Sequence, residues 1–458
     1  MSEELDPSLH EPFWLSREWW LRAGRATAAV WIATVIAFLG TVIAARELGP
    51  TGYGSMLLAI SVASLVATLL DLTLEEAIVH HGSRLLKNGA TLELRRLLRT
   101  AVWIECVNGL AVLVLTVALA SMLGTLISGD EASAGLVRIA AISIFFSTFN
   151  GTIGAVFLLD GRPDLRAWLD TWGAFVRLAT IAIAITVEAD PASILIAFAV
   201  AAAIGALTQG AVAWRRVRRR WAPRVVATDV RTAWLGPLVR FGIHSGIATS
   251  VLAGRGALLP IIFGRIAGAH ALGLLNAGML PVNAAAVASA GLRMSLLPEQ
   301  AKLAASGDWA TLRRSIRGHM SIGVLLAAPA AGVGFFVMPW LITTLYSPAF
   351  GGSVEAARIL LLAAVIQFAL SWTKTLPGAI GRPQLRTWIA AIDLAVSASL
   401  VWALADSGVV GAAGALVIST AAVAAVWIYV IQVRSTRWTT SNGSRTPSRD
   451  TPPARLSG

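Results

Sequence analysis

The chain has 458 residues, of which 56% are hydrophobic and 14% are charged, and its mean hydropathy is +0.71. Soluble domains are about one quarter charged, so this composition excludes an ordinary soluble protein. The net charge of +12 lies mainly in bases between apolar runs, which does not indicate a nucleic-acid partner. A single cysteine, Cys106, excludes a disulfide within the chain.

Long apolar runs with few charges follow one another along the chain. A helix of about 20 residues crosses a hydrocarbon layer of ~30 Å, and the runs reach that length. The pattern predicts an all-α integral membrane protein with about twelve transmembrane helices. In chain order the predicted spans are residues 26–45, 54–79, 100–128, 137–159, 167–187, 191–214, 239–264, 271–298, 319–346, 357–380, 386–405 and 408–432.

The segments around the spans divide the chain into five regions. They are a cytoplasmic N-terminal interfacial segment (1–25), a first six-helix bundle (26–214), a basic cytoplasmic linker (215–238), a second six-helix bundle (239–433) and a disordered cytoplasmic tail (434–458). The tail is rich in Ser, Thr, Pro and Arg and has no apolar periodicity, which is typical of disorder. The arginine-rich start of the linker makes anionic membrane lipid a candidate partner, although charge that merely sets topology explains it as well.

Three short patterns occur twice, in the same order and at nearly constant spacing. Gly-Arg-Pro at 161–163 returns at 381–383, an offset of 220. Arg46, Gly49 and Gly54 return at an offset of 219, and a Gly and arginine pattern in 89–99 returns at an offset of 218. The chain is therefore predicted to be a tandem duplication. With six spans in each copy, both copies enter the membrane from the same side, so the repeats are parallel.

The distribution of bases predicts the orientation. One set of loops, together with both termini, carries 29 of the 37 bases, and the opposite set carries four. The positive-inside rule then places both termini in the cytoplasm. The loops on the opposite side have about ten residues or fewer by the predicted spans, which leaves little room for a catalytic site there.

The segment 45–54, Ala-Arg-Glu-Leu-Gly-Pro-Thr-Gly-Tyr-Gly, resembles the Leu-Gly-Pro-x-x-Tyr-Gly signature of bacterial polysaccharide transporters. These are lipid-linked oligosaccharide flippases of the multidrug/oligosaccharidyl-lipid/polysaccharide exporter superfamily. Leu70-Asp71-Leu72 is similar to the family's Asp-Leu-Gly pattern, with Thr73 in the place of the glycine. Leu297-Pro298-Glu299 and the two Gly-Arg-Pro loops also resemble family features.

The resemblance implies two parallel six-helix repeats around a central cavity that opens alternately to each side of the bacterial cell membrane. It implies a cargo of oligosaccharide on undecaprenyl diphosphate, moved from the inner to the outer leaflet for surface polysaccharide or exopolysaccharide assembly. It makes polysaccharide-assembly membrane proteins candidate partners. The expected protein is a transporter rather than an enzyme, and no cofactor is expected because the sequence has no phosphate-binding Gly-Lys-Ser/Thr loop.

Moving a diphosphate through hydrocarbon requires a basic, wet cavity, because an uncompensated ion there is very costly. Four bases lie inside predicted spans. His244 shares a helix face with Arg255, and Asn276 and Asn283 share one face of the span 271–298, which suits sugar hydroxyls or helix–helix hydrogen bonds. The candidate substrate-binding residues are Arg255, Arg177, Lys374, Arg293, His244, Gln367, Asn276 and Asn283. In particular, Gln367, Ser371 and Lys374 are expected on one stripe of a continuous helix.

Acidic residues in the spans allow two interpretations. Asp71, Glu75 and Asp393 are candidates for a coupling-ion site, and each of them is also a candidate partner of a base in a structural ion pair, the interpretation that the sequence favours for Asp71 and Glu75. The six histidines show no spacing with Cys or Asp that predicts a metal site.

Two alternatives remain from the sequence. A cation-coupled multidrug efflux antiporter of the same superfamily would have an acidic central site, whereas the deepest charges here, Arg177 and Arg255, are basic. A glycosyl polymerase or ligase of the outer face is disfavoured by the short loops on that side. A peptidoglycan-precursor flippase is a close relative that usually has two extra spans, which this sequence lacks.

Overall fold

The computed structural model describes residues 17–128, 132–222, 234–382 and 384–434, and every regular element in these ranges is a helix. Fourteen α-helices follow one another: α1 (Arg17–Leu69), α2 (Leu74–Lys87), α3 (Thr91–Ser128), α4 (Ala132–Ser147), α5 (Asn150–Leu159), α6 (Pro163–Val187), α7 (Pro191–Arg220), α8 (Leu235–Gly278), α9 (Leu280–Ala305), α10 (Trp309–Leu345), α11 (Val354–Ala369), α12 (Leu376–Ala379), α13 (Gln384–Leu404) and α14 (Gly408–Tyr429). Short 3₁₀ helices cover Pro348–Ser353, Ser371–Lys374 and Ala405–Ser407, and a π turn covers Val430–Arg434.

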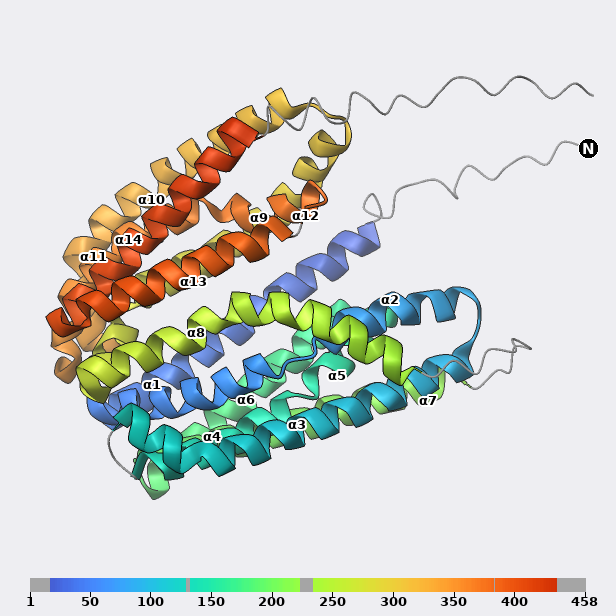
Figure 1. The fold of residues 1–458 in the computed structure, drawn as a ribbon, viewed down its shortest axis with the longest axis horizontal. Helices are drawn as coiled ribbons and strands as arrows, with labels where there is room; N and C mark the ends of the chain where they lie inside the picture. Colours follow the sequence, from blue (N-terminus) through green and yellow to red (C-terminus); the bar gives the residue numbers. More distant parts are fainter. Residues whose placement is uncertain (1–16, 129–131, 223–233, 383, 435–458) are drawn as a thin grey trace, which may run out of the picture.

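Two groups of helices lie on either side of the long helices α1 and α8 (Figure 1). Helices α2 to α7 form one group with α1, and α9 to α14 form the other with part of α8. The start of α1 and the end of α14 lie at the same end of the molecule, as the expected parallel repeats require. The two groups converge at the opposite end.

Helices α1 and α8 each contain one predicted span and the beginning of the next, joined at a sharp glycine turn. The turn in α1 is at Gly49 (φ 65°, ψ 175°), and the turn in α8 is at Gly268 (φ 83°, ψ 168°). Positive φ is strained for residues with a Cβ, so glycine is required at both places. The sequence repeat is thus also a repeat of backbone geometry. Other repeated pairs with positive φ are Gly89 with Gly307 and Gly161 with Gly381.

The two halves meet through glycines that contact each other's backbone. A Cβ on Gly54 would overlap the carbonyl oxygen of Ala269, and a Cβ on Gly273 would overlap the carbonyl oxygen of Pro50. Gly54 corresponds to Gly273, and Pro50 to Ala269, at the repeat offset of 219, so the two contacts are copies of one contact related by a pseudo-twofold axis. We call the segments 49–54 and 268–273 together the glycine junction.

Polar contacts support the glycine junction. Thr51 Oγ1 lies 3.1 Å from His270 Nδ1, and Tyr53 donates its hydroxyl proton to Asn276 Oδ1 at 2.8 Å. Tyr53 is only 1% exposed and its ring meets Phe350 edge-on. A buried tyrosine whose hydroxyl is satisfied stabilises the contact without leaving an unpaired polar group.

Several predicted spans are interrupted rather than continuous. The span predicted over 54–79 breaks at residues 70–73, and the span predicted over 137–159 breaks between α4 and α5. The span predicted over 357–380 breaks after Ala369 into the 3₁₀ turn Ser371–Lys374 and the short helix α12, in whose first turn Pro377 lies. The interfacial helix expected within residues 1–25 is not separate where the structure describes it, because α1 starts at Arg17 and runs on into the first span.

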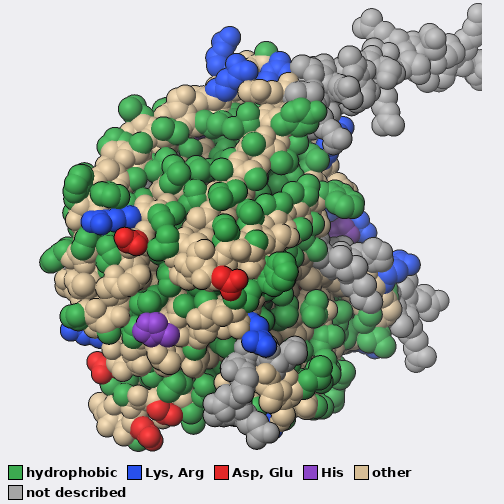
Figure 2. Space-filling view, turned by 60° about the vertical axis from the view of Figure 1, so that its left-hand side comes forward, with side chains coloured by type: hydrophobic (Ala, Val, Ile, Leu, Met, Phe, Trp, Pro, Cys, Tyr) green, Lys and Arg blue, Asp and Glu red, His purple; other side chains and the backbone are tan. Residues whose placement is uncertain are grey.

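Nine helical stretches among the described residues are long and apolar enough to cross a membrane. Three of these stretches each overlap two predicted spans: Gly24–Leu69, Thr249–Ala290 and Gln384–Gln432. The protein is thus an all-helical, multi-pass membrane protein, and the count of twelve spans stays a prediction. Figure 2 shows hydrophobic side chains spread over the visible face, with charged side chains few and scattered. Such a surface suits contact with lipid.

The glycine junction yields a first prediction. Gly273→Val should force the halves apart at this end, because the new side chain overlaps the backbone at Pro50. In a Cys106→Ser background, Thr51→Cys and His270→Cys should form an efficient cross-link, and adding Gly273→Val should reduce its yield severalfold. Gly256→Val is the matched control, since its Cβ would meet nothing within 4 Å. Equal cross-linking in both valine variants would contradict this account of the junction.

Candidate functional site: a basic cavity in the second half

A cavity of about 410 Å³ lies between α8, α11, the turn Ser371–Lys374, α13 and α14. Its charged lining consists of three bases and one acid: Arg255, Lys374, Arg386 and Asp393. Gln367, Thr373 and Thr420 add neutral polar groups. Three of the predicted substrate-binding residues and one predicted coupling-ion residue therefore share one cavity with a net formal charge of +2 (three bases less one acid).

Arg255 and Asp393 are paired across this cavity. The Nη1 of Arg255 donates to Oδ2 of Asp393 at 2.6 Å, and the hydroxyl of Ser397 donates to Oδ1 of the same carboxylate at 3.1 Å. The side chains keep 28% and 18% of their surface exposed, so the pair lies at the cavity wall rather than in a dry core. A guanidinium has five N–H donors, so this contact does not exhaust Arg255.

The helix break after α11 brings Lys374 into the lining. Lys374 ends a short 3₁₀ turn that is fixed by the buried ring of Trp372 and by a hydrogen bond from Thr375 Oγ1 to Gln300 Oε1 at 2.9 Å. The expected single stripe of Gln367, Ser371 and Lys374 is wrong, because α11 ends at Ala369 and Ser371 is buried. Gln367 and Lys374 nevertheless line the same cavity, from two consecutive elements.

Arg177 lines a different cavity, of about 350 Å³, in the first half. Its guanidinium carbon lies 5.4 Å from the centre of the Phe198 ring, in a cation–π contact. The other polar lining groups include Asp170, Asn150 and Gln209. This cavity occupies the place in the first half that the basic cavity occupies in the second, since Asp170 matches Ala390 at the repeat offset of 220. Substrate binding by Arg177 would therefore form a second site and not extend the first.

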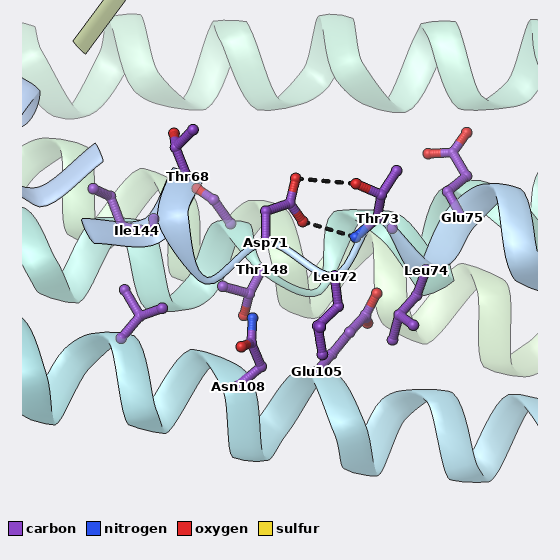
Figure 3. Close-up of a pocket in the computed structure, with 14 residues that line it drawn as sticks. Thr68, Asp71, Leu72, Thr73, Leu74, Glu75, Glu105, Asn108, Ile144 and Thr148 are labelled. Atoms are coloured by element: carbon purple, nitrogen blue, oxygen red, sulfur yellow. Dashed lines mark hydrogen bonds between the residues drawn. The ribbon is translucent and has the colours of Figure 1, made fainter. Parts of the chain in front are cut away.

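The predicted acids Asp71 and Glu75 line a third cavity, of about 340 Å³, at the break between α1 and α2 (Figure 3). Asp71 accepts hydrogen bonds from the backbone N–H and the hydroxyl of Thr73, at 3.0 and 3.4 Å, which stabilises the left-handed conformation there (φ 39°). Glu75 is held by both terminal nitrogens of Arg166, at 2.5 and 3.1 Å. Both acids thus have protein partners, one in the turn and one in an ion pair.

Glu105 is a site residue that the sequence did not single out. It rises from α3 toward the break in Figure 3, and it is only 6% exposed. Its Oε1 accepts the backbone N–H of Thr152 at 2.7 Å, in the first turn of α5, where helix N–H groups have no partner within the helix. Its Oε2 has no hydrogen-bond partner among the described residues. Glu105 therefore caps α5 from another helix, 47 residues away in the chain.

The remaining predicted residues lie elsewhere. Asn276 bonds Tyr53 at the glycine junction, and Asn283 is exposed on α9. The two asparagines do not share one helix, because α8 ends at Gly278 and α9 begins at Leu280. The side chains of His244 and Arg293 lie outside what the structure describes. Among the residues that the structure describes, no group of three or more His, Cys, Asp or Glu could hold a metal ion.

Solved transporters have the same fold. A multidrug resistance MATE family transporter of the MOP superfamily, in an inward-facing conformation, matches with a TM-score of 0.73 and 14% identity, over 89% of this chain and 95% of that chain. The lipid II flippase MurJ, in an inward closed conformation, matches with a TM-score of 0.69 and 12% identity, over 91% and 90%. A MOP superfamily transporter from Pyrococcus furiosus, described as having a binding pocket of reverse polarity, matches with a TM-score of 0.60 and 15% identity, over 91% and 95%.

These likenesses define the class of protein as a two-lobed membrane protein with the MOP superfamily fold. The chain belongs to the polysaccharide biosynthesis protein family, which it matches over residues 24–303, more than half of its length. The family resemblance predicted from the sequence is confirmed. A comparison with curated proteins found no match.

The ion pair in the basic cavity yields a prediction for stability. Arg255→Ala and Asp393→Ala should each destabilise the protein, and the double variant should lose less than their sum. The coupling energy should be about 1–2 kcal/mol, since the pair is partly exposed to the cavity. Thermal unfolding of the four proteins in one detergent measures it. Arg219→Ala, on the exposed end of α7, should combine additively with Asp393→Ala. Additivity within about 0.3 kcal/mol for the Arg255 pair would contradict the coupling.

The cap on α5 yields a second prediction for stability. Glu105→Leu should destabilise the protein by about 1–3 kcal/mol, because the N–H of Thr152 would stay buried without an acceptor. Glu105→Gln should cost clearly less, since its amide oxygen accepts the same bond. Thermal unfolding again gives the measurement, with Glu47→Leu on an exposed position of α1 as the control. Equal losses for the leucine and glutamine variants would show that the capping bond is unimportant.

Proposed function

We propose that the protein moves oligosaccharide linked to undecaprenyl diphosphate from the inner to the outer leaflet for surface polysaccharide assembly. The observation that carries this proposal is the basic cavity, in which Arg255, Lys374 and Arg386 outnumber a single acid. A diphosphate in a membrane needs positive charge and hydrogen-bond donors to replace its hydration. The family supports a role in polysaccharide biosynthesis.

The neutral lining fits the rest of such a cargo. Gln367, Thr373 and Thr420 offer donors and acceptors suited to saccharide hydroxyls, and Trp427 offers an apolar ring. The Arg255–Asp393 pair divides the cavity wall into a neutralised part and a part where Lys374 and Arg386 provide the excess charge. We place the phosphates in that second part, next to Arg255.

The arrangement of the halves supports alternating access. The glycine junction holds them together at the end opposite the termini, and the charge distribution of the sequence predicts that this end faces outward. The structure would then correspond to the state that loads cargo from the cytoplasmic leaflet. Separation of the junction, with closure at the other end, would release cargo outward. Both termini are cytoplasmic in this scheme.

A second candidate is a cation-coupled multidrug efflux antiporter. The cavity at the break between α1 and α2 favours it, because Asp71, Glu75 and Glu105 contribute three acids to one lining. A cationic drug would be attracted there, but Glu75 is already neutralised by Arg166 and Asp71 is engaged in its own turn. These partners favour a structural or coupling role for the acids and leave the anionic cargo as the first proposal.

The test of the proposal is a flipping assay in proteoliposomes with lipid-linked oligosaccharide. Arg255→Gln combined with Lys374→Gln should lower the rate by about tenfold or more, since each charge-assisted contact with phosphate is lost. Arg255→Lys should keep more activity than Arg255→Gln if charge is the decisive property. Arg219→Gln, exposed on α7 outside the cavity, is the matched control.

Two results would count against the proposal. Full flipping by the double glutamine variant would remove the basic cavity from the mechanism. Efflux of a cationic drug by the wild-type protein, without any flipping of the oligosaccharide lipid, would establish the second candidate instead.

A further inference from the structure

A fourth cavity, of about 520 Å³, opens between α3, α5 and α7 in the first half. Apart from Phe146 of α4 and Phe149 between α4 and α5, its described lining comes from these three helices, so it is separate from the basic cavity of the second half. Its walls are mostly apolar, and Val102, Leu207 and Trp214 at its margin are 45%, 70% and 61% exposed. A crevice that opens on an apolar, exposed face of a membrane protein is filled by hydrocarbon chains. We call it the lipid crevice.

One end of the lipid crevice is basic. Arg95 and Arg99 lie near the start of α3, and Arg218 lies in the last turn of α7, so all three are at the end of the molecule where the termini lie. Arg95 donates from Nη2 to the carbonyl oxygens of Val217 and Arg218, at 3.3 and 3.4 Å, which holds the two helix ends together. The Nε of Arg95 is buried and has no partner among the described residues.

The end of α7 carries five arginines, and the structure gives three of them distinct surroundings. Arg216 and Arg220 lie on one face and pair with Asp160, at 3.0 and 3.5 Å. Arg218 lies on the other face, with Trp214 one turn earlier, and both line the crevice. Arg99 and Arg218 are exposed and form no ion pair with any described residue. Structural ion pairs thus account for Arg216 and Arg220 but not for Arg99 and Arg218, which line the crevice.

The acid in the same lining lies too deep to neutralise this end. Glu105 is ten residues beyond Arg95 on α3, about 15 Å further along the helix at 1.5 Å per residue. Its Oε1 is occupied by the cap of α5. The crevice therefore has a positive, donor-rich mouth and an apolar body.

We propose that the lipid crevice binds an anionic phospholipid of the leaflet next to the termini. One acyl chain occupies the apolar body, Arg99 and Arg218 bind the phosphate, and Arg95 adds its positive charge beneath them. Arginine suits this role because its planar fork matches the oxygens of a phosphate. Trp214, at the depth of the headgroup, is the residue type that prefers the membrane interface. The lipid holds α3 against α7 and so stabilises the first half.

The proposal is tested on the full-length protein by native mass spectrometry in detergent with added phosphatidylglycerol or phosphatidylcholine. The wild-type protein should retain phosphatidylglycerol preferentially, and Arg99→Gln with Arg218→Gln should weaken its binding by about tenfold or more. Arg215→Gln with Arg219→Gln is the matched control, because it removes the same charge from exposed positions outside the crevice. The control should change binding by less than about twofold, since exposed charges that do not contact the lipid contribute little.

A further variant tests the apolar body separately. Gly210→Leu places a side chain into the crevice, where the nearest atom to a Cβ is Ile153 Cδ1 at 3.8 Å. It should lower retention of both phospholipids and leave their ratio unchanged. Phosphatidylglycerol should also raise the midpoint of thermal unfolding of the wild-type protein and of the control, but not of the Arg99 and Arg218 variant.

Three results would overturn the proposal. Equal retention of the two phospholipids by the wild-type protein would exclude recognition of an anionic headgroup. An equal loss in the control double variant would show that only the total charge of the surface matters. Displacement of phosphatidylglycerol by a lower concentration of undecaprenyl phosphate would assign the crevice to a polyprenyl chain and not to a phospholipid.

Discussion

The structure depends on the close approach of two backbones at the glycine junction. Gly54 and Gly273 each have a carbonyl of the other half where a side chain would be, and Gly49 and Gly268 make the turns that aim these segments at each other. Between membrane helices there is little hydrophobic driving force, so small residues that allow close packing provide the stabilisation. The junction gives a physical meaning to the segment 45–54, which resembles a family signature: its glycines and Tyr53 join the two halves.

Duplication has preserved the scaffold while the charges have diverged. The basic cavity and the cavity around Arg177 lie at equivalent places in the two halves, and both are lined by four corresponding spans. The position that holds Asp393 in the second half holds Gly173 in the first, and Ser397 corresponds to Arg177. The ion pair of the second half therefore has no counterpart. An asymmetric pair of cavities suits a cargo with one charged end, whereas a symmetric pair would bind it in two orientations.

The sequence predicted what repeats along the chain, and it missed what depends on contacts between distant segments. Apolar runs predicted the helices, and repeated glycines predicted the shared turns. The break at 70–73 was missed because Asp71 and Thr73 form a turn inside an apolar run. The cap of α5 by Glu105 was missed because the two partners are 47 residues apart. Arg255, Gln367, Lys374 and Asp393 were each singled out from their places in the predicted spans, but only the fold brings them into one cavity.

The Arg255–Asp393 pair also determines how a cavity of this charge could release what it binds. An anionic cargo that contacts Arg255 competes with Asp393, and a displaced Asp393 would lose this ion pair and keep the hydrogen bond from Ser397. Leaving a carboxylate short of partners in a low dielectric is costly, so binding of the cargo is weakened by the same amount. Lys374 and Arg386 line the same cavity and add positive charge to it. Transport requires binding strong enough to load and weak enough to unload, and an internal competitor beside two further bases meets both requirements.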